Sequence, residues 1–261
     1  MHTIKTSRND DGVFTVELAR PEVRNAFNED MIADLQKTFD RIAKDEDIRV
    51  VILRSSGDVF CAGGDLNWMK KGIALSAAEN LNDTRRLTRM FETMNNCPKP
   101  VVGFARGAAI GGGVGLVSVC DYVVCEKNTA FSLSEVRLGI IPACIGPFVI
   151  AKIGETHARA LFISAERFTA TRAYEIGLVH ELADSATALE AAQNRIVANL
   201  LQCGPNAMAA AKALIRGMKN PDRPAVLDYV AKMLADLRVM PEGQEGIGAF
   251  LGKRKPSWIK G

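Results

Sequence analysis

Two glycine-rich turns, each following a short apolar run, constrain the fold of this chain most. The first turn is Phe60–Leu66 (FCAGGDL), which follows the run Val50–Leu53. The second is Gly107–Gly115 (GAAIGGGVG), which follows Val101–Ala105. A short run that is apolar throughout is typical of a strand covered on both faces, as in a parallel sheet. The sequence therefore predicts a sheet whose strands lead into turns with exposed backbone.

Strand-like and helical segments alternate up to about residue 185. A turn signal at Asn9–Gly12 precedes an alternating strand at Phe14–Leu18, and Asn28 is a plausible N-cap for a helical stripe running from Met31 to Ile42. Further helices are expected at 76–95 and 111–120, and further strands at 122–125 and 130–133.

The pattern is almost wholly helical from about residue 186 onward. Helices are expected at 187–202, 205–218, 222–238 and 242–253. No linker rich in Pro, Gly or Ser separates this region from the preceding part. We therefore expect an α/β fold with a core over 1–185, which holds the functional site, and a C-terminal helical region over 186–261.

Composition excludes several classes of protein. Apolar residues make up 48% and charged residues 24%, which excludes a disordered or collagen-like chain. The net charge of +3 is too small to imply nucleic-acid binding. No apolar stretch has the length of a signal peptide or a membrane span. The six cysteines form no Cys-x-x-Cys pair, so we expect reduced thiols in a cytoplasmic protein without a metal site.

The glycine-rich turns suit the binding of negative charge. Backbone N–H groups exposed near a strand end or a helix N-terminus can stabilise an anion or a developing oxyanion. Tight turns without a ligand are the plain alternative. A phosphate-binding loop is disfavoured because the second turn lacks G-x-x-x-x-G-K-[ST]. A dinucleotide fingerprint is weakened because Ser118 stands at the third position after Gly113-Val114-Gly115.

The two turns, their spacing and the later stretch Ser134–Pro142 resemble the crotonase (enoyl-CoA hydratase/isomerase) superfamily. The resemblance begins at Arg20-Pro21 with Asn25-Ala26-Phe27, continues through a helix-and-strand signature at Ala173–Val179, and ends at Gly246–Trp258. It implies a spiral of ββα units and a helical C-terminal region that trimerises, giving trimers or dimers of trimers.

The same resemblance implies an acyl-CoA thioester site in which CoA is part of the substrate and no other cofactor is needed. The amides of Gly64 and Gly112 would form the oxyanion hole, and Ala62, Gly64 and Leu66 would line the adenine site. Arg24 and Lys253 would meet the CoA phosphates. The remaining expected substrate contacts are Ala26, Asp65 and Trp68.

One carboxylate stands out as the acid/base group. Hydratases of the resembled family hold water with two glutamates, and the matching positions here are Gly115 and Glu135. The chain therefore departs from the two-glutamate pattern at Gly115, which puts simple crotonyl-type hydration in doubt. Glu135 would carry a proton between water and the substrate, and an apolar pocket would raise its pKa for that task.

Several reactions fit a single glutamate. The sequence around Gly115 and Glu135 resembles methylglutaconyl-CoA hydratases, which favours a hydratase acting on 3-methylglutaconyl-CoA or a similar branched substrate. A Δ3,Δ2-enoyl-CoA isomerase, an acyl-CoA decarboxylase or hydrolase, and a binding module without turnover are the alternatives, with RNA binding an outsider. A substrate carboxylate would be met by one of several candidates, namely Asn67, Lys70, Lys71, Arg85, Arg86, Arg89 and Arg137.

Overall fold

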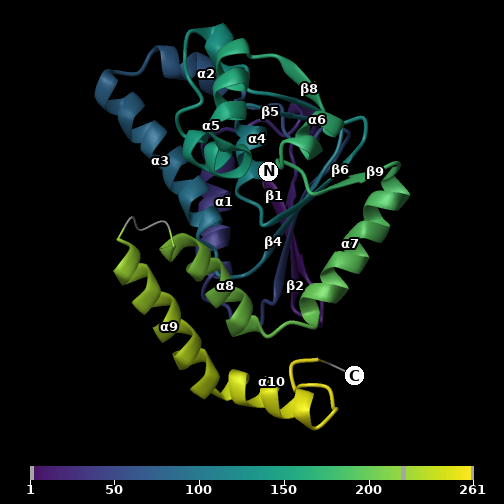
Figure 1. The fold of residues 1–261 in the computed structure, drawn as a ribbon. Coiled ribbons are helices and arrows are strands. Elements are labelled where there is room, and N and C mark those ends of the chain that lie inside the picture. The colour runs from purple at the N-terminus through teal and green to yellow at the C-terminus, as the bar shows by residue number, and fades with distance from the viewer. Residues whose placement is uncertain (1–2, 219–221, 260–261) are drawn as a thin grey trace.

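The computed structural model describes residues 3–218 and 222–259, which form a large sheet, a small sheet and the helices around them (Figure 1). The large sheet has the order β1-β2-β3-β4-β6-β9, in which only the β1–β2 pair is antiparallel. The small sheet has the order β5-β7-β8. The strands are β1 (Ile4–Arg8), β2 (Val13–Leu18), β3 (Val50–Ser55), β4 (Val101–Ala105), β5 (Ala108–Ile110), β6 (Tyr122–Glu126), β7 (Ala130–Ser132), β8 (Arg167–Thr169) and β9 (Glu181–Ala183).

Helices surround both sheets, so the predicted mixed α/β fold is confirmed. Two short 3-10 helices, η1 (Pro21–Val23) and η2 (Glu135–Leu138), lie in the connections. The α-helices are α1 (Glu29–Ile42), α2 (Leu66–Ile73), α3 (Ala77–Asn95), α4 (Gly112–Ser118), α5 (Gly146–Ser164), α6 (Ala170–Glu175), α7 (Ala186–Leu201), α8 (Pro205–Gly217), α9 (Arg223–Val239) and α10 (Pro241–Leu251).

The predicted turn and N-cap near the N-terminus are confirmed. The Asn9 side chain accepts hydrogen bonds from the amides of Asp11 and Val13, which closes the β1–β2 hairpin. Asn28 Oδ1 accepts from the Met31 amide at 2.9 Å and so satisfies one of the unpaired donors at the start of α1.

Three segments differ from the sequence prediction. Strand β5 lies inside the second glycine-rich turn, because its three residues pair with β7. Helix α4 ends at Ser118 and not at Cys120. The strand expected within Ala173–Val179 is wrong: after α6 the chain turns through Gly177 (φ 79°), and the strand begins at Glu181.

The central strands are covered on both faces, as their apolar runs predict. On β3, Val51 and Leu53 belong to the main core, which includes residues of α1, α3, α4 and α5. Val50 and Ile52 point to the other face, where they share a second cluster with Ala192 and others of α7. The sheet therefore holds the carboxyl ends of β3 and β4 rigidly, and both glycine-rich turns leave from there.

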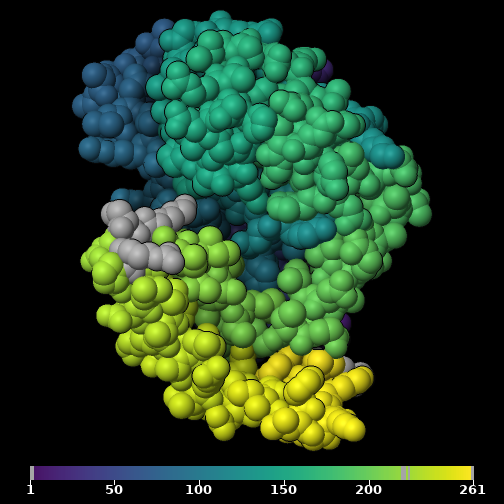
Figure 2. Space-filling model, in the orientation of Figure 1, coloured from purple at the N-terminus to yellow at the C-terminus, as the bar shows by residue number. Residues whose placement is uncertain are grey.

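Helices α8 to α10 form an arm at one end of the molecule (Figure 1) and border a hollow on the face shown in Figure 2. Among the described residues of these helices, only Val226 and Ala249 are buried. Large apolar side chains stay exposed, including Leu234, Val239 and Phe250. No helix within the described ranges has both the length and the apolarity needed to cross a bilayer.

Candidate active site

The two glycine-rich turns lie directly against each other. The Cys61 amide donates to the Ala108 carbonyl at 3.1 Å, and the Ile110 amide donates to the Cys61 carbonyl at 2.9 Å. A Cβ atom on Gly113 would lie only 2.5 Å from the Cys61 carbonyl oxygen. Glycine is therefore required at this point for the two backbones to approach so closely.

The direction of the Gly64 amide follows from the bonds on either side of it. Gly63 O accepts from the Phe27 amide at 2.7 Å, and the Asp65 amide donates to Phe27 O at 2.8 Å. In a trans peptide the C=O and the next N–H point in opposite directions. The Gly64 N–H therefore points away from the Phe27 backbone, and it has no acceptor in the part of the chain that the structure describes.

Gly112 presents a second free amide. It is the first residue of α4, following Gly111 (φ 51°), and its N–H has no partner among residues 3–218 and 222–259. A Cβ on Gly112 would lie 2.8 Å from the Phe27 ring. Phe27 thus touches both amide-bearing segments and brings them together. Free N–H groups at a helix start carry partial positive charge, as an oxyanion hole requires.

The carboxylate of Glu135 lies beside these amides. Glu135 begins η2, and its Oε1 would be 3.0 Å from a Cβ on Gly111. Its Oε2 is buried and has no hydrogen-bond partner within the described ranges. Burial raises the pKa of Glu135 above its ordinary value, and the residue's own amide offsets only part of the effect. A buried carboxyl of this kind can hold and release a proton.

Gly115 lies in the core and leaves no room for a side chain. A Cβ there would be 2.3 Å from Ile145 Cγ2 and 2.9 Å from the Phe91 ring. The space that a second carboxylate would need at this position is filled by these two apolar side chains. The structure therefore gives a physical reason for the departure from the two-glutamate pattern.

The residues predicted to contact acyl-CoA near the first turn have different environments. Asp65 is 5% exposed, and its carboxylate is bound by Arg20 and by the amides of Asn67 and Trp68. Leu66 is 82% exposed. The others are Ala26 (buried), Ala62 (half-buried) and Trp68 (half-buried and packed on the core). Their contact with substrate stays a prediction.

The two cations predicted to meet CoA phosphates do not come together within one chain. Arg24 is exposed, and its carbonyl accepts from the Ala62 amide beside the first turn. Lys253 is also exposed and follows α10, which lies at the far end of the molecule from α2 and α4 (Figure 1). If Lys253 meets the same ligand as Arg24, it must come from a second copy.

Exposed apolar side chains occur in the segments around Glu135. The connection that follows Glu135 reaches α3, since the Cys144 thiol donates to the Thr84 carbonyl of that helix at 3.9 Å. Such a surface suits a hydrophobic acyl chain. The exposed apolar residues are Leu66 and Ile73 of α2, Leu81 of α3, and Leu138, Ile140 and Ile141 after Glu135.

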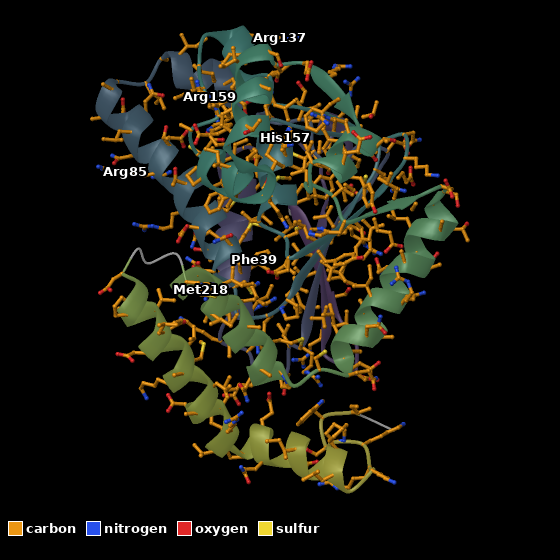
Figure 3. All side chains as sticks on the ribbon, in the orientation of Figure 1. Phe39, Arg85, Arg137, His157, Arg159 and Met218 are labelled. Atoms are coloured by element: carbon orange, nitrogen blue, oxygen red, sulfur yellow. The ribbon has the colours of Figure 1, made fainter. Side chains whose placement is uncertain are left out.

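Most candidates for a substrate carboxylate face elsewhere. Arg85, Arg86 and Arg89 line a hollow of about 810 Å³ between α1 and α3. Lys71 pairs with Glu29 at 3.2 Å. Arg137 is exposed two residues after Glu135, and Figure 3 shows it well separated from Arg85. Lys70 is exposed on α2, and Arg137 is the candidate cation nearest to Glu135 along the chain.

Two residues that support the site were not identified from sequence. Arg20 binds the Asp65 side chain of the first turn and the Ala26 carbonyl. Asn25 donates to the carbonyls of Ser56 and Val59 just before the turn, with a φ of 55° while fully buried. The family resemblance includes Asn25, and the tolerance of asparagine for left-handed backbone is a second sequence signal that could have suggested its role. No group of three or more His, Cys, Asp or Glu side chains that could hold a metal ion occurs within the described ranges.

Comparison with known proteins adds independent findings. A family model described as enoyl-CoA hydratase/isomerase matches residues 8–261. The crystal structure of an enoyl-CoA hydratase from Shewanella pealeana is 35% identical and superposes with a TM-score of 0.95, covering 98% of this chain and 96% of that one.

Two curated relatives carry different reaction names. A 2,3-dehydroadipyl-CoA hydratase of Escherichia coli is 32% identical over 247 residues, which cover 94% of each chain. A peroxisomal Delta(3,5)-Delta(2,4)-dienoyl-CoA isomerase of Arabidopsis thaliana is 29% identical over 262 residues, covering 96% of this chain and 94% of its own.

Proposed function

Since the chain belongs to the enoyl-CoA hydratase/isomerase family and has its crotonase-type fold, we propose that it adds water across the 2,3-double bond of an enoyl-CoA. The observation that carries this proposal is the Glu135 carboxylate at the start of α4, where the Gly112 amide is free among the described residues. Its Oε1 lies beside Gly111, and its buried Oε2 has no hydrogen-bond partner within the described ranges. A proton carrier and an oxyanion donor in one place are the two groups that the reaction needs.

The reaction proceeds through an enolate. Glu135 takes a proton from water as the water oxygen bonds to C3, and the π electrons move to the thioester oxygen. The amides of Gly64 and Gly112 stabilise this oxygen more strongly as an enolate than as a carbonyl, so they lower the barrier. Glu135 then returns the proton to C2, and the enolate collapses to the 3-hydroxyacyl thioester.

The substrate class is a branched or carboxylated enoyl-CoA, with 3-methylglutaconyl-CoA as the best candidate. The exposed apolar side chains around Glu135 suit a branched acyl chain, and Arg137 offers a guanidinium for a distal carboxylate. The name of the Escherichia coli relative, a dehydroadipyl-CoA hydratase, supports a dicarboxylic substrate class.

Isomerisation of a 3-enoyl-CoA is the second candidate. It needs one proton carrier that moves a proton between two carbons, and no water. The side chains of Ile145 and Phe91 at Gly115 leave Glu135 without a second carboxylate, which favours this chemistry over two-carboxylate hydration. The isomerase among the relatives supports it as well.

Assembly and location complete the proposal. The exposed apolar side chains of α8 to α10 support a homotrimer or a dimer of trimers. The cysteines are all free, and four of them are buried, which supports a reducing, cytoplasmic environment.

The test is a substrate panel followed by enoyl-thioester absorbance and by mass spectrometry in ¹⁸O-water. We expect rapid loss of absorbance and ¹⁸O incorporation with 3-methylglutaconyl-CoA, and little change with crotonyl-CoA. Glu135→Gln should lower kcat by about 10²–10⁴-fold and still bind the thioester. The control is Glu166→Gln, at an exposed carboxylate outside the site.

Other outcomes would redirect the proposal. An absorbance rise with a trans-3-enoyl-CoA alone, without ¹⁸O in the product, would identify an isomerase. Full activity in Glu135→Gln would exclude the mechanism above.

A further inference from the structure

We propose that Arg20 is a positioning residue for the oxyanion site, acting through its buried ion pair with Asp65 to fix the peptide that carries the Gly64 amide. The inference deepens the proposed function and rests on it, because it assigns Gly64 to the thioester oxygen. Arg20 itself follows β2 and lies outside both glycine-rich turns.

The guanidinium of Arg20 contacts two segments, the first glycine-rich turn at Asp65 and the facing segment at Ala26. Its Nη2 lies 2.8 Å from Asp65 Oδ2, and its Nη1 donates to the Ala26 carbonyl at 2.5 Å. The side chains of the pair are only 16% and 6% exposed. The fork of an arginine can hold two acceptors at a fixed separation, which a lysine cannot do.

Asp65 transmits this contact to Gly64. Its Oδ1 accepts from the amides of Asn67 and Trp68 at 2.8 and 3.4 Å, which starts α2, and its own amide donates to Phe27 O. Burial opposes ionisation of Asp65, but the bonds from Arg20 and these two amides outweigh it and lower its pKa. The residue next to Gly64 is thereby fixed through both its side chain and its backbone.

The opposing segment is held in a conformation that needs such support. Arg24 and Asn25 both have left-handed backbone, with φ of 54° and 55°. Asn25 Nδ2 donates to the carbonyls of Ser56 and Val59, and its Oδ1 accepts from the Arg20 amide. Strained backbone persists only where its surroundings determine it, and such strain gathers at functional sites. Arg20 thus holds the segment that contains Phe27. The backbone of Phe27 bonds to Gly63 and to Asp65, the residues on either side of Gly64.

A purely structural ion pair would make different predictions. Loss of a structural pair lowers stability but leaves the chemistry of the folded molecules unchanged. Loss of a positioning pair misaligns the Gly64 amide, and a misplacement of about 1 Å costs on the order of 100-fold in rate. The polarisation of a bound thioester carbonyl separates the two roles because it reports the amides without any turnover.

The experiment compares Arg20→Gln and Arg20→Lys with wild type, using cinnamoyl-CoA as the bound probe. Polarisation of its carbonyl shifts its absorbance to longer wavelength. We expect Arg20→Gln to lose most of this shift and to lower kcat by about 100-fold with a smaller change in KM. Arg20→Lys should give an absorbance shift and a kcat between those of wild type and Arg20→Gln, because it keeps the positive charge beside Asp65 and loses the bond to Ala26. The matched control is Arg54→Gln, which removes an exposed pair with Glu17 at the end of β3.

A lower Tm with an unchanged probe shift in both Arg20 variants would overturn the proposal. So would the absence of any shift in wild type. Failure of the proposed function is recognised separately, since a wild-type protein that shifts the probe but hydrates no substrate keeps the oxyanion site and loses only the assigned reaction. If Arg20→Gln does not fold, Arg20→Lys decides the question by the same shift.

Discussion

The surroundings of Glu135 favour its protonated form over the charged carboxylate. One of its oxygens is buried without a partner among the described residues, and burial raises its pKa above the ordinary value. The proposed reaction starts from ionised Glu135. We therefore expect kcat/KM to fall as pH decreases, with an apparent pKa above that of an ordinary glutamate.

The measurement is a pH profile of kcat/KM from about pH 4 to about pH 9, with protein stability checked at each pH. A rate that stays constant until the ordinary range of a glutamate would contradict the expectation. A steep loss that coincides with unfolding would also contradict it.

The raised pKa of Glu135 has a consequence for stability. Between the unfolded and the folded pKa, the native state binds more protons than the unfolded state, so Glu135 lowers stability as pH rises through this interval. Glu135→Gln should therefore raise the Tm at about pH 8 more than at about pH 4. Thermal melts at both pH values test this, with Glu166→Gln as the exposed control. An equal effect at both pH values would show that ionisation of Glu135 does not destabilise the folded protein.

Gly115 offers a test of how tightly the core closes behind the site. A Cβ there would lie 2.3 Å from Ile145 Cγ2, so Gly115→Ala should destabilise the protein by about 1–3 kcal/mol. Adding Ile145→Ala removes the clashing methyl, so the double variant should lose less than the sum of the two single effects. Urea unfolding measures all three. The control is Gly248→Ala in α10, where a Cβ would meet nothing within 4 Å and should do no harm. If the losses of stability in the two single variants simply add in the double variant, Ile145 is not the side chain that excludes a Cβ at Gly115.

At the scale of elements, local signals predicted more than long-range ones. Strand β4 occurs at Val101–Ala105 as its apolar run predicts, and α1 begins after the N-cap Asn28. Strand β5 could not be found locally, because its three residues form a strand only through pairing with β7. From the sequence, Arg20 was placed at the start of the family resemblance and was assigned no role in the site. Its bond to Asp65 joins residues 45 positions apart, and no local pattern shows such a contact.

A half-buried histidine at the junction of β6 and β9 predicts a loss of stability in acid. His180 stacks on Tyr122 at 4.9 Å, and its Nδ1 accepts from the Val123 amide. Burial, with a smaller contribution from Lys152, lowers its pKa to about 4. The unfolded chain takes up a proton near the ordinary value of 6.5, whereas the folded chain does not, so stability should fall as pH decreases from about 6.5 to about 4.

Thermal melts between about pH 7 and about pH 4 test this expectation. His180→Gln should be less stable at neutral pH because it loses the stacking, and it should lose less stability on acidification. His157→Gln, at a histidine of α5, is the control (Figure 3). An acid dependence that is equal in wild type and His180→Gln would assign the effect to other groups.

At the scale of the whole molecule, the arm of α8 to α10 leaves large apolar side chains exposed. Val239 and Phe250 are 77% and 81% exposed, and we infer that this surface is an interface between copies of the chain. We expect wild type to sediment as a trimer or a dimer of trimers. Val239→Arg with Phe250→Arg should shift it toward monomer. Lys5→Glu, at an exposed residue of β1, is the control. A monomeric wild type with full activity would contradict this expectation.

Assembly also decides whether the predicted CoA site is complete. Arg24 lies beside the first glycine-rich turn, whereas Lys253 follows α10 at the opposite end of the chain, so only a neighbouring copy can bring the two together (Figure 1). Lys253→Gln should then raise KM for a CoA thioester by about tenfold, since a phosphate loses one charge-assisted contact. It should leave KM unchanged for the matching pantetheine thioester, which has no such phosphates. The interface variant should show the same selective loss, because dissociation removes Lys253 from the site. An equal rise in KM for both thioesters would place Lys253 away from the CoA phosphates.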